Sequence, residues 1–418
     1  MQPTVVSEHW TSRHADLSVD DFLARLGETP FALLHGEGRW IIHGEDPLLL
    51  LEEPHLEGLT FLRSGDLPPI HPDFVGFVGY EFGRRLESLL PAPAPSDFPL
   101  PEFQFALHER MRIYDRETHT LFEGRRRVPR QAPVARHLLG RGPFSARKIA
   151  DSDTPERYGE KVARIREEIA AGNVYQVNLT REERWQWQGD LTEFARRLAV
   201  ADPAPHSALI AGPDFAVVSA SPESFLRIHQ GRIVTRPIKG TAPRSADPQE
   251  DRALAEGLMA SPKNRSELAM ITDLLRNDLT RICRVPSVRV EAFPLLESYA
   301  RVHHLVAIVS GELMPGLTLE SLLSATFPGG SITGCPKLAA MTLIRGLEDR
   351  ARGVYTGALG WFSHDLSQLD LAISIRTAWA SEDELRFAVG GGIVWDSDPR
   401  EEYLETVHKG ASLVRCLN

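Results

Sequence analysis

The sequence has 418 residues, of which 42% are hydrophobic and 25% are charged, as in an ordinary soluble globular protein. The net charge of −10 argues against nucleic acid or an anionic membrane as the main partner. The three cysteines are widely spaced and form no CxxC motif, so we expect neither a disulfide framework nor a zinc site. No signal peptide or membrane-spanning run is recognisable, so we expect a cytoplasmic protein.

The first third of the chain is predicted to be rich in strands. Residues 31–35 and 40–43 predict a hairpin across a glycine-containing turn, and residues 74–80 predict a further strand. A proline-rich stretch over 90–101 and a basic stretch over 125–147 predict surface connections rather than helices or strands.

From Thr154 onward helical signals appear between the strands. Thr154 followed by Pro155 is a favourable helix start, and Gly172 is a plausible stop. Further helices are predicted over 248–259, 262–282, 337–350 and 401–416, and strands over 176–179, 215–218, 359–363, 371–377, 385–389 and 393–395. Residues 225–228 and 233–235 predict a hairpin over Gln230 and Gly231. This order favours an α+β fold with mostly antiparallel sheets.

Lys239 and Glu223 are the first candidates for chemistry. If Gln230 and Gly231 form the turn, Glu223 faces Ile238, next to Lys239, although the pairing must break near Pro237 for the two side chains to meet. A lysine is nucleophilic only when burial or a nearby cation lowers its pKa. The alternative for both residues is an ordinary solvated charge.

Carboxylates on two predicted helices form a second candidate site. Glu402, Glu405 and Lys409 share one face of the last helix, and Glu267 and Asp273 lie on another helix. Their oxygens could bind magnesium. A surface stripe of ion pairs is the usual meaning of such spacing, and that alternative stays open.

Glycine-rich segments and single cations could hold an anion. Residues 329–337 lead into a helix, and Gly390–Gly392 lie between two predicted strands; both suit either an anion site or tight turns. Arg376 is predicted within an apolar strand and needs an anionic partner, either a protein carboxylate or a substrate, with Arg244 and Lys409 as possible additions.

Taken together, these segments resemble the chorismate-utilising enzymes, which include anthranilate synthase component I, aminodeoxychorismate synthase component I, and the isochorismate and salicylate synthases. The resemblance covers about residue 154 to the C-terminus, and the N-terminal segment 76–84 resembles the amine-forming branch. The matching segments are 219–223, 237–241, 264–267, 273–278, 304–306, 327–330, 333–337, 352–355, 390–393 and 402–409.

The resemblance implies two large, mostly antiparallel β-sheets packed together with helices outside, in α/β/β/α layers. It also implies an N-terminal region over 1–150 that is intertwined with a chorismate-binding catalytic region over 151–418. Two positions indicate the branch. Gln176 stands where water-using members carry a lysine base, and Lys239, like Asn264, is typical of the aminodeoxychorismate branch rather than of anthranilate synthases.

The resemblance further implies a role for each candidate residue. Lys239 is expected to be the covalent nucleophile and Glu223 the general acid, while His304 is expected near the ring, with a core histidine as its alternative. Mg²⁺ is the implied cofactor, with Glu267 and Glu405 as ligands and Glu402 close by. The implied contacts to substrate are Gly240, Thr241, Tyr355, Arg376, Gly390, Gly391, Gly392, Lys409, Thr333 and Gln176.

The implied reaction is the amination of chorismate at C4 for 4-aminobenzoate and folate synthesis. No glutaminase nucleophile motif is recognisable, so we expect ammonia from a separate glutamine amidotransferase subunit, and a homodimer is also possible. Three alternatives stay open: anthranilate synthase component I, a regulator that binds a ligand without turnover, and an unrelated anion-binding module.

Overall fold

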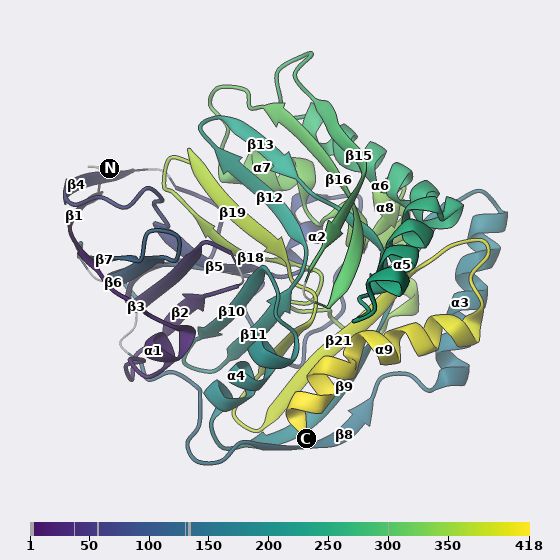
Figure 1. Ribbon diagram of the computed structural model, residues 1–418, viewed down its shortest axis with the longest axis horizontal. Coiled ribbons are helices and arrows are strands. Elements are labelled where there is room, and N and C mark those ends of the chain that lie inside the picture. The colour runs from purple at the N-terminus through teal and green to yellow at the C-terminus, as the bar shows by residue number, and fades with distance from the viewer. Residues whose placement is uncertain (1–3, 37, 57, 130, 133–134, 300) are drawn as a thin grey trace.

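The computed structural model describes residues 4–36, 38–56, 58–129, 131–132, 135–299 and 301–418 (Figure 1). Its strands are β1 (Thr4–His14), β2 (Phe31–Leu34), β3 (Trp40–Leu51), β4 (Leu59–Gly65), β5 (Phe74–Val78), β6 (Phe103–Asp115), β7 (Thr120–Arg127), β8 (Ser145–Asp151), β9 (Gln176–Gln188), β10 (His206–Ala211), β11 (Ala216–Ser221), β12 (Ser224–His229), β13 (Arg232–Thr235), β14 (Ile238–Pro243), β15 (Arg289–Ser298), β16 (Val302–Glu312), β17 (Gly334–Cys335), β18 (Ala358–Phe362), β19 (Gln368–Ile373), β20 (Thr377–Ala380) and β21 (Glu384–Ile393). Its helices are α1 (Val19–Leu23), α2 (Phe82–Leu86), α3 (Pro155–Ala170), α4 (Leu191–Ala201), α5 (Pro248–Ala260), α6 (Pro262–Thr280), α7 (Leu319–Thr326), α8 (Lys337–Leu347), α9 (Pro399–Leu417) and the 3₁₀ turn η1 (Gly330–Ile332).

The strands divide at β6 into two halves. In the first half, β6 pairs with β3, and the order continues through β2, β10, β11, β20, β21, β9 and β8. In the second half, β6 pairs with β5, and the order continues through β18, β19, β12, β13 and β16, with β14 and β15 also on β16. The pairings are antiparallel except that of β1 with β4. Strands of the first 150 residues therefore pair directly with later strands.

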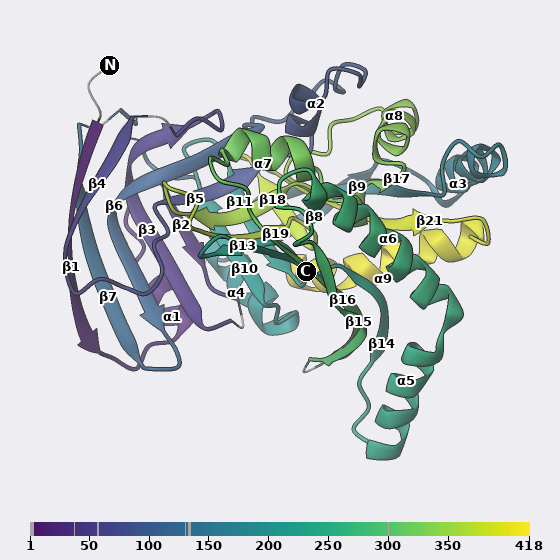
Figure 2. The ribbon, with the colours of Figure 1, turned by 90° about the horizontal axis from the view of Figure 1, so that it is seen from above.

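Apolar side chains between the two halves form one core. Helices lie on the outer faces of the two halves (Figure 2). Phe77 and Leu359 of the second half share a cluster with Val217 and Trp379 of the first. Helices α4 and α9 cover the first half, and α6 and α7 cover the second. Burial of each large apolar side chain stabilises this packing by about 1.5–3 kcal/mol. The predicted α/β/β/α layering is confirmed.

Several elements predicted from local signals lie where they were expected. The hydroxyl of Thr154 accepts a hydrogen bond from the Arg157 N–H at the start of α3. Gln230 and Gly231 have φ values of 49° and 79°, which suit the two-residue turn between β12 and β13. No helix in the described parts of the chain combines the length and the apolar character needed to cross a membrane.

The prediction of a surface connection over residues 125–147 was wrong at both ends. Strand β7 extends to Arg127, and β8 begins at Ser145. The guanidinium of Arg126 is fully buried and lies 2.8 Å from a Glu8 oxygen and 3.1 Å from an Asp73 oxygen. Arg63 pairs with the same two carboxylates. Composition suggested a solvated segment, but these buried acids hold one arginine inside the fold.

We expect Arg126→Met to lower the free energy of unfolding by about 3–5 kcal/mol, because it removes one partner from a buried ion pair and leaves carboxylate charge poorly compensated. Arg125→Met is the matched control, since the Arg125 side chain is 66% exposed and pairs with Glu109; there we expect a change within about 0.5 kcal/mol. Urea denaturation measures both. Equal effects of the two substitutions would contradict the argument.

Two further predictions about strands were also wrong. The predicted strand over 371–377 is interrupted between β19 and β20, where Arg376 has a φ of 50° and the chain crosses from the second half to the first. Gly390–Gly392 lie within the continuous strand β21 rather than between two strands. A Cβ at Gly390 would lie 2.4 Å from the Leu179 carbonyl oxygen, so close strand contact, rather than a turn, requires glycine there.

Candidate active site

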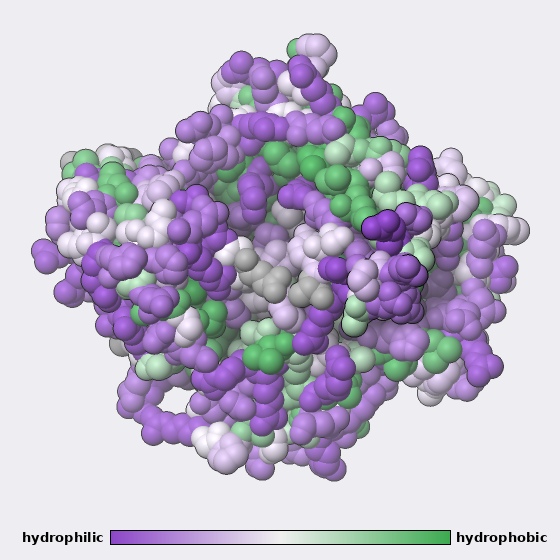
Figure 3. Space-filling model, viewed as in Figure 1, coloured by the Kyte–Doolittle hydropathy of each residue, from purple (hydrophilic) through white to green (hydrophobic). Residues whose placement is uncertain are grey.

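A cavity of about 550 Å³ lies where the two halves meet. One wall is formed by β9, β21 and α9 and the other by β14, β16 and α6, and the surface is hollowed between these elements (Figure 3). The chain crosses between the halves here twice, at Glu223 and near Arg376. The predicted residues that line the cavity are Glu223, Lys239, Gly240, Thr241, Glu267, His304, Tyr355, Arg376, Gly390, Gly392, Glu402, Glu405 and Lys409.

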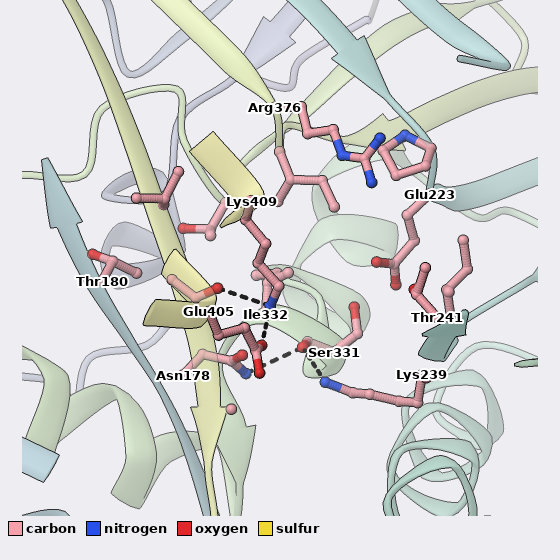
Figure 4. Close-up of a pocket in the computed structure, with 18 of the residues that line it drawn as sticks. Asn178, Thr180, Glu223, Lys239, Thr241, Ser331, Ile332, Arg376, Glu405 and Lys409 are labelled. Carbon is pink, nitrogen blue, oxygen red and sulfur yellow. Dashed lines mark hydrogen bonds and ion pairs between the residues drawn. The ribbon is translucent and has the colours of Figure 1, made fainter. Parts of the chain in front are cut away.

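Lys239 extends from β14 into this cavity (Figure 4). Its Nζ donates to the backbone carbonyl of Ser331 at 3.3 Å, and the Asn178 side chain donates to the same oxygen at 3.1 Å. Burial lowers the pKa of Lys239, although the charges of nearby carboxylates oppose the shift. The next residue, Gly240, has a φ of 79°, and a Cβ there would lie 2.8 Å from the Asn264 side chain. The lysine therefore occupies a restricted, partly dehydrated position.

Glu223 lies beside Lys239 and is 6% exposed. Burial raises the pKa of Glu223, and this shift is partly offset by hydrogen bonds from the Ser331 side chain and the Ile238 N–H and by the charge of Lys239. The pairing does break near Pro237, as expected, because β14 pairs with β16 rather than with β12. The shifts of both groups favour a protonated carboxyl beside an uncharged amine.

Three carboxylates line the cavity, one from α6 on one wall and two from α9 on the other: Glu267, Glu402 and Glu405. Ser397 donates to Glu402 at 2.5 Å, and Lys409 Nζ lies 2.6 Å from Glu405. Burial and the charge of Glu405 raise the pKa of Glu402, although the Ser397 hydrogen bond opposes this. In the described residues no three acidic, histidine or cysteine side chains are close enough to form a ready-made metal site. The oxygen donors and their crowded negative charge nevertheless suit a hydrated Mg²⁺ ion.

Strand β21 presents an open edge to the cavity. Its pairing with β20 reaches only Phe387, so β9 is the one neighbouring strand of residues 388–393 within the part of the chain that the structure describes. The Gly390 carbonyl accepts from Lys409 Nζ at 3.0 Å, which shows that Gly390 points its backbone groups away from β9. Backbone groups alternate in direction along a strand, so the N–H and carbonyl of Gly392 also point away from β9, whereas those of Gly391 point toward it. The N–H groups of Gly390 and Gly392 are thus available to an anion.

The family comparison agrees with this cavity of anion donors and carboxylates. A model of the family described as chorismate binding enzyme matches residues 42–415. The chain belongs to the chorismate-binding enzyme family. It is 38% identical over 376 residues to aminodeoxychorismate synthase component 1 of Salmonella typhimurium, which covers 87% of this chain and 81% of that protein. It is 36% identical over 402 residues to anthranilate synthase component 1 of Streptomyces coelicolor, which covers 90% of this chain and 78% of that protein.

Solved structures of the chorismate-binding enzymes share this architecture. Anthranilate synthase component I from Streptococcus pneumoniae TIGR4 matches with a TM-score of 0.76 and 27% identity, covering 96% of this chain and 98% of that one. The menaquinone-specific isochorismate synthase from Escherichia coli matches with a TM-score of 0.78 over the whole of this chain and 96% of that one; at 17% identity it shows the shared fold alone. The protein is therefore an enzyme that uses chorismate.

Cationic and aromatic groups of this chorismate-binding enzyme line the rest of the cavity. Arg376 lines it too, but its guanidinium pairs with a protein carboxylate, that of Asp202, at 2.7 Å. His304 Nδ1 lies 3.0 Å from the Thr241 hydroxyl, and burial together with the charge of Arg376 lowers the pKa of His304 to about 4. Tyr355 is buried, which raises its pKa. His304 is thus a neutral, anchored ring at the cavity wall.

Several predicted positions lie outside this cavity. Gln176 and Thr333 are fully buried; the Thr333 hydroxyl donates to the Gly329 carbonyl, and the Gln176 amide packs against Gly392. Gly391 turns its backbone N–H and carbonyl toward β9, so none of these three residues is among those that line the cavity. Asp273 lines a separate surface cavity and pairs with Arg276 at 2.5 Å, while Arg244 pairs with Asp251 at the surface.

Other residues of the chorismate-binding enzyme contribute to the cavity without having been predicted. Ser331 supplies the carbonyl that holds Lys239, and Asn178 bonds to the same oxygen. Lys263, in the first turn of α6, adds a positive charge facing Glu402 and Glu405. A backbone carbonyl carries no side-chain signal, and a lysine after Ser261–Pro262 is typical of any exposed helix start.

Proposed function

We propose that the chain is component I of an aminodeoxychorismate synthase, which replaces the C4 hydroxyl of chorismate with an amino group. The observation that carries this proposal is the pair of Lys239 and Glu223, which face one cavity with a lowered amine pKa and a raised carboxyl pKa. Relatives of that name from Salmonella typhimurium, Klebsiella aerogenes and Escherichia coli are 36–38% identical to the chain.

In the proposed reaction, the uncharged Nζ of Lys239 forms a bond to ring carbon C2. The ring double bonds shift, and the bond between C4 and its hydroxyl oxygen breaks. Glu223 donates its proton to this oxygen, so that water leaves instead of hydroxide. Ammonia then bonds to C4, the double bonds shift back, and the lysine amine is expelled. Covalent catalysis divides one difficult substitution into two easier ones.

The carboxylates of Glu267, Glu402 and Glu405 would hold Mg²⁺ at the end of the cavity nearest α9. When bound, the ion would withdraw electron density from the ring carboxylate of the substrate. The glycine N–H groups on the open edge of β21 would bind that same carboxylate. Lys409, Tyr355 and Arg376 would hold the second, enolpyruvyl carboxylate of chorismate. Gly240 and Thr241 would complete the pocket beside Lys239.

The ammonia would come from a separate glutamine amidotransferase subunit. The relatives are named component 1, which supports a partner component. The product would keep its enolpyruvyl group, and a further enzyme would remove that group to give 4-aminobenzoate for folate synthesis. We place the reaction in the cytoplasm.

Mass spectrometry of the intact protein tests the proposal. Incubation with chorismate and Mg²⁺ in the absence of ammonia should add the mass of chorismate less one water, and peptide mapping should place the addition on Lys239. Lys239→Ala should form no adduct, whereas Lys148→Ala, a surface substitution, should form it as the wild type does. Amination that continues unchanged in Lys239→Ala, with no adduct in the wild type, would reject the nucleophile.

Anthranilate synthase component I is the second candidate function. It is supported by the 36% identity to the Streptomyces coelicolor protein over 90% of the chain. The two reactions differ in their products. Anthranilate is fluorescent and forms with release of pyruvate, whereas aminodeoxychorismate keeps the pyruvyl group. We therefore expect no pyruvate when the chain is supplied with chorismate, Mg²⁺ and ammonium; stoichiometric pyruvate would select the alternative.

A further inference from the structure

Lys409 contacts a proposed metal ligand and the strand edge beside which the substrate would bind. Its Nζ lies 2.6 Å from a Glu405 oxygen and 3.0 Å from the Gly390 carbonyl oxygen (Figure 4). Glu405 is a proposed metal ligand, and Gly390 belongs to the open edge of β21 that would receive a substrate carboxylate. The ammonium group of Lys409 therefore pairs with the proposed metal ligand Glu405 and, through the Gly390 carbonyl, lies beside the proposed carboxylate site.

We propose that Lys409 is an internal counterion that pairs with Glu405 in place of the metal. When the metal binds, the Lys409 side chain would change partner from Glu405 to a carboxylate of the substrate. This inference rests on the proposed function, because it uses the proposed magnesium site. A divalent cation on Glu405 would repel the ammonium group from the same carboxylate. Lys409 would then be released from Glu405 while remaining beside the cavity, where an anionic substrate can accept its charge.

The geometry of α9 permits this transfer. Lys409 lies one helical turn after Glu405, so rotation about its side-chain bonds moves the ammonium group without moving the helix. The two side chains are 48% and 49% exposed, so neither is locked in place by packing. Glu402, by contrast, is 7% exposed and is held by Ser397, so that carboxylate stays in position while its neighbour changes partner.

The transfer has two opposite effects on binding. Without substrate, Lys409 competes with the metal for Glu405 and weakens metal binding. With substrate present, the same lysine is attracted to the substrate carboxylate, and the competition is relieved. Metal and chorismate should therefore strengthen each other's binding, and because coupling is reciprocal, either one can be used to measure it.

The first test measures Mn²⁺ binding to the full-length protein by electron paramagnetic resonance, with Mg²⁺ competition and no chorismate. We expect Lys409→Met to bind Mn²⁺ up to about fivefold more tightly than the wild type, the range of a partly exposed ion pair. The matched control is Lys263→Met, which removes the same charge from the cavity wall but no ion pair with Glu405; there we expect a clearly smaller gain. Equal gains in both variants, or no gain in Lys409→Met, would overturn the proposal.

The second test uses Lys239→Ala as a background, so that chorismate stays unreacted. In this background, chorismate should increase the affinity for Mn²⁺, and adding Lys409→Met should reduce that increase. An unchanged increase would show that Lys409 does not carry the coupling and would overturn the proposal. Metal binding without substrate does not depend on the nucleophile, so failure here is distinguishable from failure of the mass-spectrometry test of the function.

Discussion

Substitution of Glu223 by glutamine should lower the rate of amination by about 10²- to 10⁴-fold, the usual contribution of a general acid. Glutamine keeps the shape of the side chain but has no acidic proton for the departing hydroxyl group. The buried position of Glu223 raises its pKa and so keeps a larger fraction of the carboxyl groups protonated at neutral pH. Steady-state assays with saturating ammonium and Mg²⁺ measure the loss directly.

The loss should appear in kcat rather than in chorismate affinity. Glu320→Gln is the matched control, because this α7 residue has a side chain that is 58% exposed and lies outside the cavity; its rate should equal that of the wild type. In the wild type, activity should also decline as the pH rises through the pKa of Glu223, because the protonated form is required. A glutamine variant with nearly normal kcat would remove Glu223 from the chemistry.

The second large effect that we expect is a steep loss of stability in mild acid. His43 of β3 and His108 of β6 are both buried, and so is His35, which follows β2. Burial lowers the pKa of His43 and of His108 to about 3 and that of His35 to about 4, with adjacent arginine charges acting in the same direction. Each ring is therefore neutral in the folded state at pH values where the unfolded chain binds a proton.

The direction in which stability changes with pH follows from proton linkage. The unfolded histidines have a pKa of about 6.5, so below that pH the unfolded state binds more protons than the folded state. Stability is complete above this value and falls as the pH decreases toward the folded pKa values. Each fully shifted histidine contributes about 1.4 kcal/mol per pH unit, so the three together contribute about 4 kcal/mol per pH unit below about pH 5.5. Near pH 4 this loss reaches the typical free energy of unfolding of a protein, about 5–15 kcal/mol, so we expect the chain to unfold there.

Urea denaturation followed by circular dichroism at pH 7.5, 6.0 and 5.0 checks this expectation. His43→Leu should reduce the pH slope of stability by about 1.4 kcal/mol per pH unit if the variant folds. Substitution of the exposed His229 should leave the slope unchanged. Proton resonances of the wild-type histidines give an independent measurement, since the rings of His35, His43, His108 and His304 should not titrate above pH 5. Equal stability at pH 5.0 and 7.5 would contradict the assignment.

Local signals in the sequence predicted much of the fold. Thr154–Pro155 and Ser261–Pro262 start helices because a side-chain cap and a fixed φ act within a few residues. The hairpin between β12 and β13 was likewise predictable from its turn. The register of β3 with β6, or of β5 with β18, depends on segments far apart in the chain, and no local pattern specifies it.

The candidate site was predictable in its side chains but not in its backbone. The resemblance named Lys239, Glu223 and the acids of α6 and α9, and the structure brings them to one cavity. It did not show that Arg376 lies at a crossing between the two halves, where a left-handed backbone ends the ladder. The resemblance also did not show that the Ser331 carbonyl accepts a hydrogen bond from Lys239. This contact depends on where η1 places a peptide group rather than on the type of residue.

The cavity takes its reactive groups and most of its proposed anchoring groups from opposite walls, with Glu267, Gly240 and Thr241 as the anchoring groups on the reactive side. Lys239 and Glu223 belong to the side built from β14 and the start of β12, whereas Gly390, Gly392 and the acids of α9 belong to the opposite side. A change of nucleophile on one layer can therefore leave substrate recognition on the other intact. In evolutionary terms, this separation allows descendants of one ancestral scaffold to acquire new products through few substitutions.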